Sequence, residues 1–495
     1  MMKQAFLILC TGVFISTSPC LTGQEPGRDP LMEQFHAISS HDLLNWAATL
    51  SSPEFNGRMT GSPGFVKATT WVAENLEKWG IKPAGDEGTY FQWFDHGYNE
   101  VHNLGGLSLH IPIKGGDTII KQYRFPDGYF PGMNSGSGEV TAEVVFVGYG
   151  VTAPELDYDD YAGVDVQGKI VMFCRDVPYK DSRNPEYSKW VKYCYHHYKL
   201  DNAVKHGAAG MIYIDGLHAN PNISYHPGFV WCGIGDEVLN DLFAGQKHTY
   251  REIMGKIDQS FKPHSFPTGK MMTIRASTTW HEGKACNVLG MIPGTDPGLK
   301  DEWVVVGAHL DAVGNCGVLL PGALDNASGC VDIMGAARAM AAAGIPLKRS
   351  VLFAFFGGEE TGLVGSGLVA RKLKQEGKKV AAYINLDMVG NGTGFHLAGG
   401  STWPEVFKHF EAANEKYLHR SMGSSEVRSH YGRPRSDAAH FEKAGIPTLS
   451  LYTTRPVKPV YYHLPGDDVH SLTPEIMEDA AKLLLLSLTG IANEE

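Results

Sequence analysis

The sequence predicts an α/β fold with a mostly parallel central sheet and helices on both faces. Over residues 285–490, short apolar runs rich in Val, Ile, Leu and Phe alternate with helical stretches. Such alternation is typical of parallel sheets. The apolar runs are continuous, which favours strands buried on both faces. Ligands of these sheets bind beyond the carboxyl ends of the strands, so the residues at those ends point to the function.

Composition excludes some classes of protein. The chain of 495 residues is 43% hydrophobic and 20% charged, which is typical of globular proteins, and its net charge is -11. The negative charge and the lack of a long Lys/Arg run argue against a nucleic-acid partner. After the N-terminus, no segment is long and apolar enough to suggest an integral membrane span.

Residues 1–23 have the pattern of a signal peptide: one basic residue, an apolar run from Ala5 to Ile15, then small polar residues. The run is shorter than the ~20 residues of a membrane helix. We therefore expect export to the periplasm or the medium. A lipid anchor at Cys20 is less favoured, because Pro19 fits that cleavage pattern poorly. The remaining six cysteines form no CxxC pair and leave any disulfide pairing open.

Residues 30–125 are predicted to form the N-terminal part of the main domain. Helical spacing of apolar residues runs through FVKATTWVAENLEKWG and stops at Gly80, and the turn-rich segment SSPEFNGRMTGSPG precedes it. This part shows no obvious chemistry. We expect it to cover one flank of the sheet.

Residues 126–275 are predicted to form a separate, strand-rich domain, because short apolar runs alternate with Gly, Pro and Asp turns. Its Asp-rich loop, DYDDYAGVDVQGKI, lacks the spacing of a calcium loop and is explained as turns. His196 and His197 have no acidic partner at ligand spacing, which favours a partly exposed helix face. The runs VVFVGYGVTAPELDYDDYAGVDVQGKIV and GAAGMIYI resemble the protease-associated domain, which implies a role as a lid or in substrate access.

Residues 276–495 carry the polar residues of interest, each after a predicted strand or before a predicted helix. Burying such groups is costly unless they are paired or bind a metal. Histidine and carboxylates gathered at converging strand ends are the ligand types of a His/carboxylate metal site. The residues concerned are His309, Asp311, Asp325, Glu359, Glu360, Asp387 and His463.

The motifs HLD, GALDNASG, GGEETGLVGS, NLDMVG and YYHLPGDD, in this order, resemble the co-catalytic zinc aminopeptidase family. That family includes bacterial leucyl aminopeptidases and relatives of glutamate carboxypeptidase II. The resemblance covers residues 285–490, and GRMTGSPG is similar to the family's opening segment. It implies a zinc-dependent metallo-exopeptidase that removes N-terminal residues from peptides with a free N-terminus.

The resemblance also implies roles for single residues. Each of two Zn²⁺ ions would have three protein ligands and an open position, which marks a catalytic zinc. The implied ligands are His309 and Asp387 for the first ion, Glu360 and His463 for the second, and Asp325 as the bridge. Glu359 would be the general base that takes a proton from the attacking water.

Two further roles are implied. Asp311 would accept the other ring N–H of His309 and fix its tautomer. The hydroxyl of Tyr462 would support the oxyanion. The Asp325–Asn326 bond matches a position where the family has a cis peptide.

The sequence departs from the family after Ser436-Asp437, where a histidine is often found, and this leaves the lining of the substrate pocket open. The pattern around Arg433 and Arg435 favours a solvated basic loop. The alternative is that they and Arg455 meet a substrate carboxylate, as a carboxypeptidase for acidic-tailed dipeptides would require. A glutaminyl cyclase would use one zinc at a similar ligand set, and a receptor-like binding protein would have lost its ligands. The preferred side chain and the oligomeric state remain open.

Overall fold

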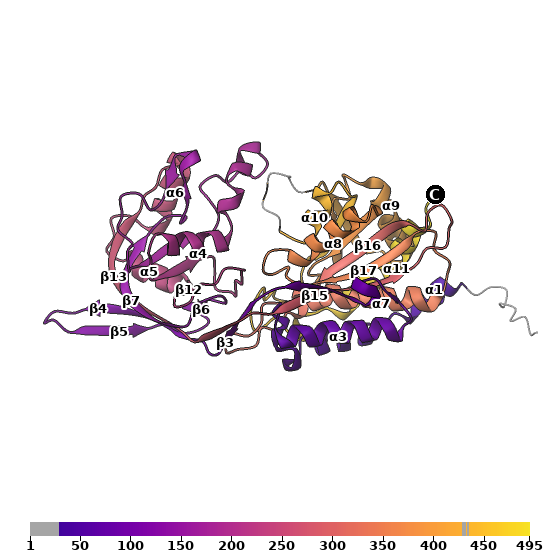
Figure 1. The fold of residues 1–495 in the computed structure, drawn as a ribbon, viewed down its shortest axis with the longest axis horizontal. Helices are drawn as coiled ribbons and strands as arrows, with labels where there is room; N and C mark the ends of the chain where they lie inside the picture. Colours follow the sequence, from indigo (N-terminus) through magenta and orange to yellow (C-terminus); the bar gives the residue numbers. More distant parts are fainter. Residues whose placement is uncertain (1–28, 428–431, 433–434) are drawn as a thin grey trace, which may run out of the picture.

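The computed structural model describes residues 29–427, 432 and 435–495, which form two lobes (Figure 1). The first lobe is built on a nine-stranded sheet and the second on an eight-stranded sheet. A two-stranded ribbon of β3 (Tyr98–Val101) and β14 (Thr278–His281) lies between them. The expected signal peptide, Cys20 and Arg433 fall outside the described residues.

The centre of the nine-stranded sheet is parallel, in the order β17, β16, β18, β21, and antiparallel strands flank it on both sides. This confirms the predicted α/β fold. Its strands are β1 (Lys82–Pro83), β2 (Phe91–Asp95), β15 (Lys284–Ile292), β16 (Glu302–His309), β17 (Ser350–Phe356), β18 (Lys379–Leu386), β19 (Gly394–Ala398), β20 (Ser421–Ser425) and β21 (Thr448–Thr454).

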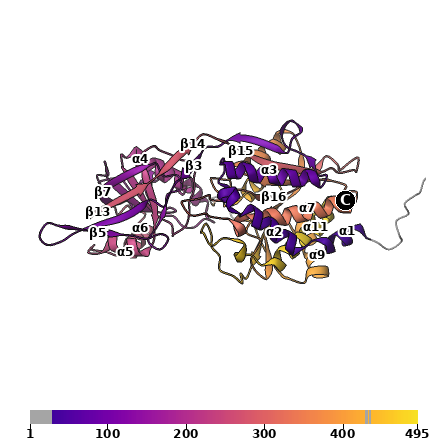
Figure 2. The same cartoon turned by 90° about the horizontal axis from the view of Figure 1, so that it is seen from below.

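Helices cover both faces of this sheet, as the sequence predicts. Successive side chains of a strand point to opposite faces. Val304 and Val306 of β16 therefore join the core beneath α2, α3, α7 and α11, which Figure 2 shows on one side, while Val305 packs with residues of α8 and α10. The helices of this lobe are α1 (Pro30–Ala37), α2 (Ser40–Leu50), α3 (Pro63–Lys78), α7 (Ser328–Ala343), α8 (Val364–Gln375), α9 (Pro404–Ala413), α10 (Ala438–Lys443) and α11 (Pro474–Asn493).

The second lobe has the strand order β5-β4-β13-β7-β10-β11-β12-β6, with β7, β10, β11 and β12 parallel. Because β4 and β5 already belong to this sheet, the chain enters the second lobe before the expected boundary at residue 126. The strands are β4 (Gly106–Pro112), β5 (Thr118–Gln122), β6 (Tyr129–Pro131), β7 (Gly138–Phe146), β10 (Ile170–Cys174), β11 (Gly210–Ile214), β12 (Val230–Ile234) and β13 (Phe266–Ala276). A short pair, β8 (Thr152–Ala153) and β9 (Tyr158–Asp159), and the helices α4 (His196–Lys205), α5 (Asp236–Phe243) and α6 (Tyr250–Ser260) complete it.

Two local expectations in the second lobe meet different outcomes. The Asp-rich loop consists of turns around the short strand β9, and Asp160 accepts hydrogen bonds from the amides of Tyr149 (3.0 Å) and Val151 (3.1 Å) and the hydroxyl of Tyr158 (2.7 Å). The expectation that His196 lies on a partly exposed helix face is wrong, because its ring is buried against Tyr213 at 4.3 Å between centroids.

An apolar cluster joins the lobes, and we call it the interlobe cluster. It combines side chains of the turn before α3, the ribbon strand β3, the loop after β16 and the second lobe. Its buried members are Met59, Val101, Phe130, Met133, Ala219, Val313, Cys316 and Leu320. The six cysteines among the described residues are all buried, and none of them forms a disulfide bond. Within the same part of the chain, no helix has the length and apolar character needed to cross a membrane.

Candidate metal centre

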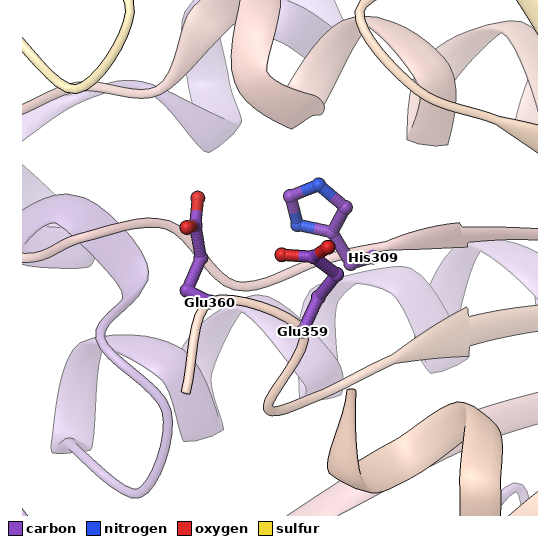
Figure 3. Close-up of side chains that lie close together, drawn as sticks. All are labelled: His309, Glu359 and Glu360. Atoms are coloured by element: carbon purple, nitrogen blue, oxygen red, sulfur yellow. The ribbon is translucent and has the colours of Figure 1, made fainter. Parts of the chain in front are cut away.

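Three parallel strands deliver polar side chains to one edge of the first sheet. β16 ends at His309, Asp387 follows β18 directly, and Gly357-Gly358 leads from β17 to Glu359 and Glu360. Gly358 has φ 78°, a backbone conformation that favours glycine, so it makes the turn that brings Glu359 back toward β16. Figure 3 shows the imidazole of His309 and the two glutamate carboxylates gathered above the strand ends.

The other two implied ligands come from loops. Asp325 lies in the turn before α7, where its peptide bond to Asn326 is cis, and His463 lies in the loop after β21. Asp467 holds the turn in place: its Oδ1 accepts from the amide of Leu324 (2.8 Å) and its Oδ2 from that of Asp325 (3.1 Å). Both loops therefore meet above the same strand ends.

Asp325 lies between the two histidines and offers one oxygen to each. Its Oδ1 is 3.2 Å from Nε2 of His309, and its Oδ2 is 3.4 Å from Nε2 of His463. Asp387 Oδ1 is 3.6 Å from the first of these nitrogens, and Glu360 Oε2 is 2.9 Å from the second. The structure thus brings all five implied ligands together, in two sets of three that share Asp325.

The outer nitrogen of each imidazole faces a main-chain carbonyl. Nδ1 of His309 is 3.1 Å from the oxygen of Asp311, and Nδ1 of His463 is 2.8 Å from the oxygen of Ala219. A carbonyl only accepts hydrogen bonds, so both Nδ1 atoms carry the proton. In the neutral rings, each Nε2 then presents its lone pair to carboxylate oxygens. A cation between these atoms, either a proton on Nε2 or a bound metal ion, relieves the repulsion between them, and imidazole nitrogen with carboxylate oxygen suits zinc.

The charges of the site also call for cations. Burial lowers the pKa values of His309 and His463, but the surrounding carboxylates outweigh it and raise both well above the ordinary value. Burial raises the pKa values of Glu359 and Glu360. At Asp325 burial acts in the same direction, yet the two imidazoles hold its pKa below the ordinary value. These carboxyl groups therefore depend on nearby positive charge to stay ionised.

Asp311 lies beside His309, but the contact differs in its atoms from the implied one. Its carboxylate Oδ1 is 3.6 Å from Nδ1 of His309, farther than its main-chain oxygen. The carboxylate instead accepts from the amides of Glu359 (3.3 Å) and Glu360 (3.2 Å) and from the hydroxyl of Thr60 (2.7 Å). Asp311 thus shapes the turn that carries both glutamates.

The N-terminal segment that seemed free of chemistry contributes to this centre, so that expectation is wrong. Arg58 is fully buried and donates to main-chain carbonyls, at 2.8 Å to Leu310 and 2.7 Å to Gly322. It thereby holds both ends of the loop between His309 and Asp325. Thr60 also accepts from the amide of Gly358 at 3.0 Å. The GRMTGSPG motif was the available signal for both residues.

The remaining candidates lie at different depths. Tyr462 is 45% exposed and stacks on the His463 ring at 3.7 Å between centroids. Asp437 is buried near His309, and burial raises the pKa of its carboxyl to about 7. Arg435 and Arg455 are exposed. Within the described residues, every group of side chains with metal-ligand spacing belongs to this centre, and neither His196 nor His197 is among them.

Comparisons with known proteins agree with this geometry. The model of peptidase family M28 matches residues 287–488. A probable leucine aminopeptidase of Arthroderma otae is 31% identical over 228 residues, which cover 44% of this chain and 60% of the relative. A second one, of Trichophyton verrucosum, is 32% identical over 256 residues, which cover 50% of this chain and 69% of the relative. The matches thus span about two thirds or less of these fungal relatives.

A solved structure extends the likeness to both lobes. BSAP, a zinc aminopeptidase from Bacillus subtilis, superposes with a TM-score of 0.60 at 21% identity. The superposition covers 92% of this chain and 96% of that one. The two proteins therefore share their overall fold.

Proposed function

The chain belongs to peptidase family M28, and from this premise we propose that it is an exported aminopeptidase with two zinc ions. It would hydrolyse the N-terminal peptide bond of peptides that have a free N-terminus. The fungal relatives are named as leucine aminopeptidases, and BSAP as a zinc aminopeptidase, which supports this activity and this metal.

One observation carries the proposal: the two oxygens of Asp325 face two different histidines. This divides the ligands into one set with His309 and Asp387 and another with Glu360 and His463. A single zinc ion would need only one set. Two complete sets that share a carboxylate favour two ions side by side.

We assign Glu359 the role of proton carrier. It belongs to neither set, yet it lies within ligand distance of His309 and Glu360. Bound zinc supplies Lewis acidity, which favours loss of a proton from water and neutralises charge developing on the carbonyl oxygen. Glu359 takes that proton as the new carbon–oxygen bond forms. It then gives the proton to the amine as the carbon–nitrogen bond breaks, releasing an amino acid and a shortened peptide.

We assign Tyr462 a supporting role beside His463. Its ring lies flat on that of His463, and its edge remains exposed. From there its hydroxyl donates a hydrogen bond to the carbonyl oxygen as negative charge develops on it.

The other readings are less well supported. A carboxypeptidase would need arginines that line the site, and Arg435 and Arg455 are exposed. A glutaminyl cyclase would need one ligand set, whereas both are present. A receptor-like protein would have lost ligands, and all five are in place.

A substrate panel tests the activity. It contains aminoacyl amides, the same compounds with a blocked amine, and peptides with N-terminal Gln, each with and without chelator. We expect hydrolysis of free N-termini only, which is lost on chelation and restored by zinc. Cleavage of blocked substrates from the C-terminus, or cyclisation of Gln without hydrolysis, would replace the proposal by one of its alternatives.

Export is a proposal that rests on residues 1–23 alone. Expression of the full chain in a bacterial host, followed by fractionation and N-terminal sequencing, tests it. We expect a chain outside the cytoplasm that has lost about this segment. An intact N-terminus in the cytoplasmic fraction would contradict it.

A further inference from the structure

A loop of the second lobe reaches into the metal centre of the first. It comprises Asp215–Asn220, follows β11, and we call it the clasp loop. The amide of Ala219 donates to the main-chain oxygen of His463 at 3.2 Å, and the oxygen of Ala219 lies 2.8 Å from Nδ1 of the same histidine. One residue of the second lobe thus contacts both the backbone and the ring of an implied ligand.

The backbone of His463 needs such support. It has φ 56°, a left-handed conformation that costs free energy for a residue other than glycine and persists only when neighbours hold it. The pairing with Ala219 provides that restraint. The ring contact adds a second one: because Nδ1–H donates to the carbonyl of Ala219, the Nε2 lone pair is turned toward Asp325 and Glu360.

The two histidines differ in where this restraint comes from. The partner of His309 is the main-chain oxygen of Asp311, two residues along the same segment. The partner of His463 is 244 residues away in sequence and belongs to the other lobe. The first ligand set is therefore held within the first lobe, whereas the second set depends on the position of the second lobe.

The clasp loop is itself held in place. Ala219 is buried in the interlobe cluster, which also contains side chains of the loop after β16 such as Val313 and Leu320. The His218 ring braces the loop from inside: its Nδ1 is 2.9 Å from the oxygen of Ala219 and its Nε2 is 2.9 Å from that of Asp215. The same ring meets His463 edge-on, at 5.8 Å between centroids.

We propose that the clasp loop is a positioning element of the second zinc site, with Ala219 holding His463 through its main chain and His218 supporting Ala219. This rests on the proposed two-zinc function. The second lobe thereby sets the affinity of one zinc site and leaves the other unchanged. Outer partners of ligand histidines typically change metal affinity 10–100-fold.

Calorimetric titration of the metal-free chain with zinc tests this without measuring activity. Ala219→Pro removes the amide that donates to His463, and His218→Ala removes the brace. His226→Ala is the control, because it deletes a histidine of the same lobe whose ring nitrogen instead lies 2.8 Å from Asp201.

We expect Ala219→Pro to weaken the second zinc site about 10–100-fold and to leave the first unchanged. His218→Ala should have the same effect at a smaller size, and His226→Ala should change neither site. A role confined to overall stability would weaken both sites together in all folded variants. If Ala219→Pro fails to fold, His218→Ala decides: two unchanged affinities in that variant overturn the inference.

The wild-type titration distinguishes a failure of this inference from a failure of the proposed two-zinc function. A wild-type chain that binds fewer than two zinc ions contradicts the proposed function. Two ions in the wild type, with no selective loss in Ala219→Pro or His218→Ala, contradict only the role of the clasp loop. Amide exchange of the metal-free wild type adds a direct readout: the Ala219 amide should be protected, and rapid exchange would count against the clasp.

Discussion

The two lobes share a structural device but use it differently. Both contain neighbouring parallel strands, whose carboxyl ends meet at one edge of a sheet. In the second lobe a side-chain cation lies at that edge: Arg175 after β10 pairs with Asp215 after β11 at 2.9 Å and lies 3.4 Å from the carboxylate of Asp176. In the first lobe, carboxylates and imidazoles gather after β16, β17 and β18, and the buried cation beside them, Arg58, donates to carbonyls.

This difference indicates what makes a metal site on such a fold. Topology supplies the edge in both lobes. In the first lobe the four carboxylates of the centre face only two imidazoles, and buried negative charge in excess is stable only when a further cation joins it. The following predictions test that contrast, from the largest expected effect to the smallest.

Asp325→Ala should remove both zinc ions and with them all activity, because both ligand sets share this carboxylate. Metal content of the purified protein measures the effect. The control is Asp215→Ala, which removes a carboxylate at the corresponding edge of the second lobe. A zinc ion should remain bound in the first ligand set of this variant, because that set does not depend on the clasp loop, to which Asp215 belongs. Retention of one tightly bound zinc in Asp325→Ala would show that the bridge is not needed.

Glu359→Gln should lower kcat by about 10²–10⁴-fold, the usual contribution of a general base, while zinc content stays that of the wild type. Steady-state kinetics and metal analysis together measure this. Glu376→Gln, an exposed residue just after α8, is the control and should behave as wild type. Wild-type turnover in Glu359→Gln would exclude Glu359 as the base.

Thr60→Val should lower activity about 10–100-fold, as loss of outer support for a metal site usually does. The change removes the hydroxyl that bonds to Asp311 and leaves the amide of Gly358 without its partner. Thr70→Val is the control, since Thr70 is exposed on α3. Kinetics at saturating zinc measure the effect, and equal rates for the two variants would contradict a role for Thr60.

Asp332→Asn should stabilise the first lobe. Among the described residues, Asp332 of α7 is buried without a hydrogen-bond partner, and burial raises its pKa well above the ordinary value. A raised folded-state pKa means that stability falls as pH rises from the ordinary carboxyl range toward the folded-state pKa. Replacing the ionisable carboxyl by an amide should raise Tm at neutral pH by about 2–4 °C for each kcal/mol gained in the free energy of unfolding. Thermal melts between pH 4 and 8 measure this, and a lower Tm at pH 7 would contradict it.

Much of the first lobe could be predicted from the sequence. Apolar strands, helical spacing and polar residues at the strand ends are local patterns, and they placed His309, Asp325 and Asp387 at one edge. The sequence also predicted a second, strand-rich unit, because short apolar runs alternate there with Gly, Pro and Asp turns. Its first strands, β4 and β5, lie before the expected boundary.

The contacts that hold the site could not be predicted in the same way. Arg58 and Thr60 meet residues about 250 positions later, and that distance carries no local pattern. Ala219 acts through its main chain, which any residue type possesses, so its identity gives no signal. Likewise, which atom of Asp311 faces His309 depends on a turn geometry that only the structure shows.

Native mass spectrometry of the zinc-loaded chain tests the central claim most directly, because it counts the ions on each molecule. The two ligand sets predict two zinc ions on the wild type and one on each of Asp387→Ala and Glu360→Ala, which remove a ligand from one set only. A wild-type chain that carries one zinc ion or none, at concentrations that saturate binding, would contradict the two-metal centre.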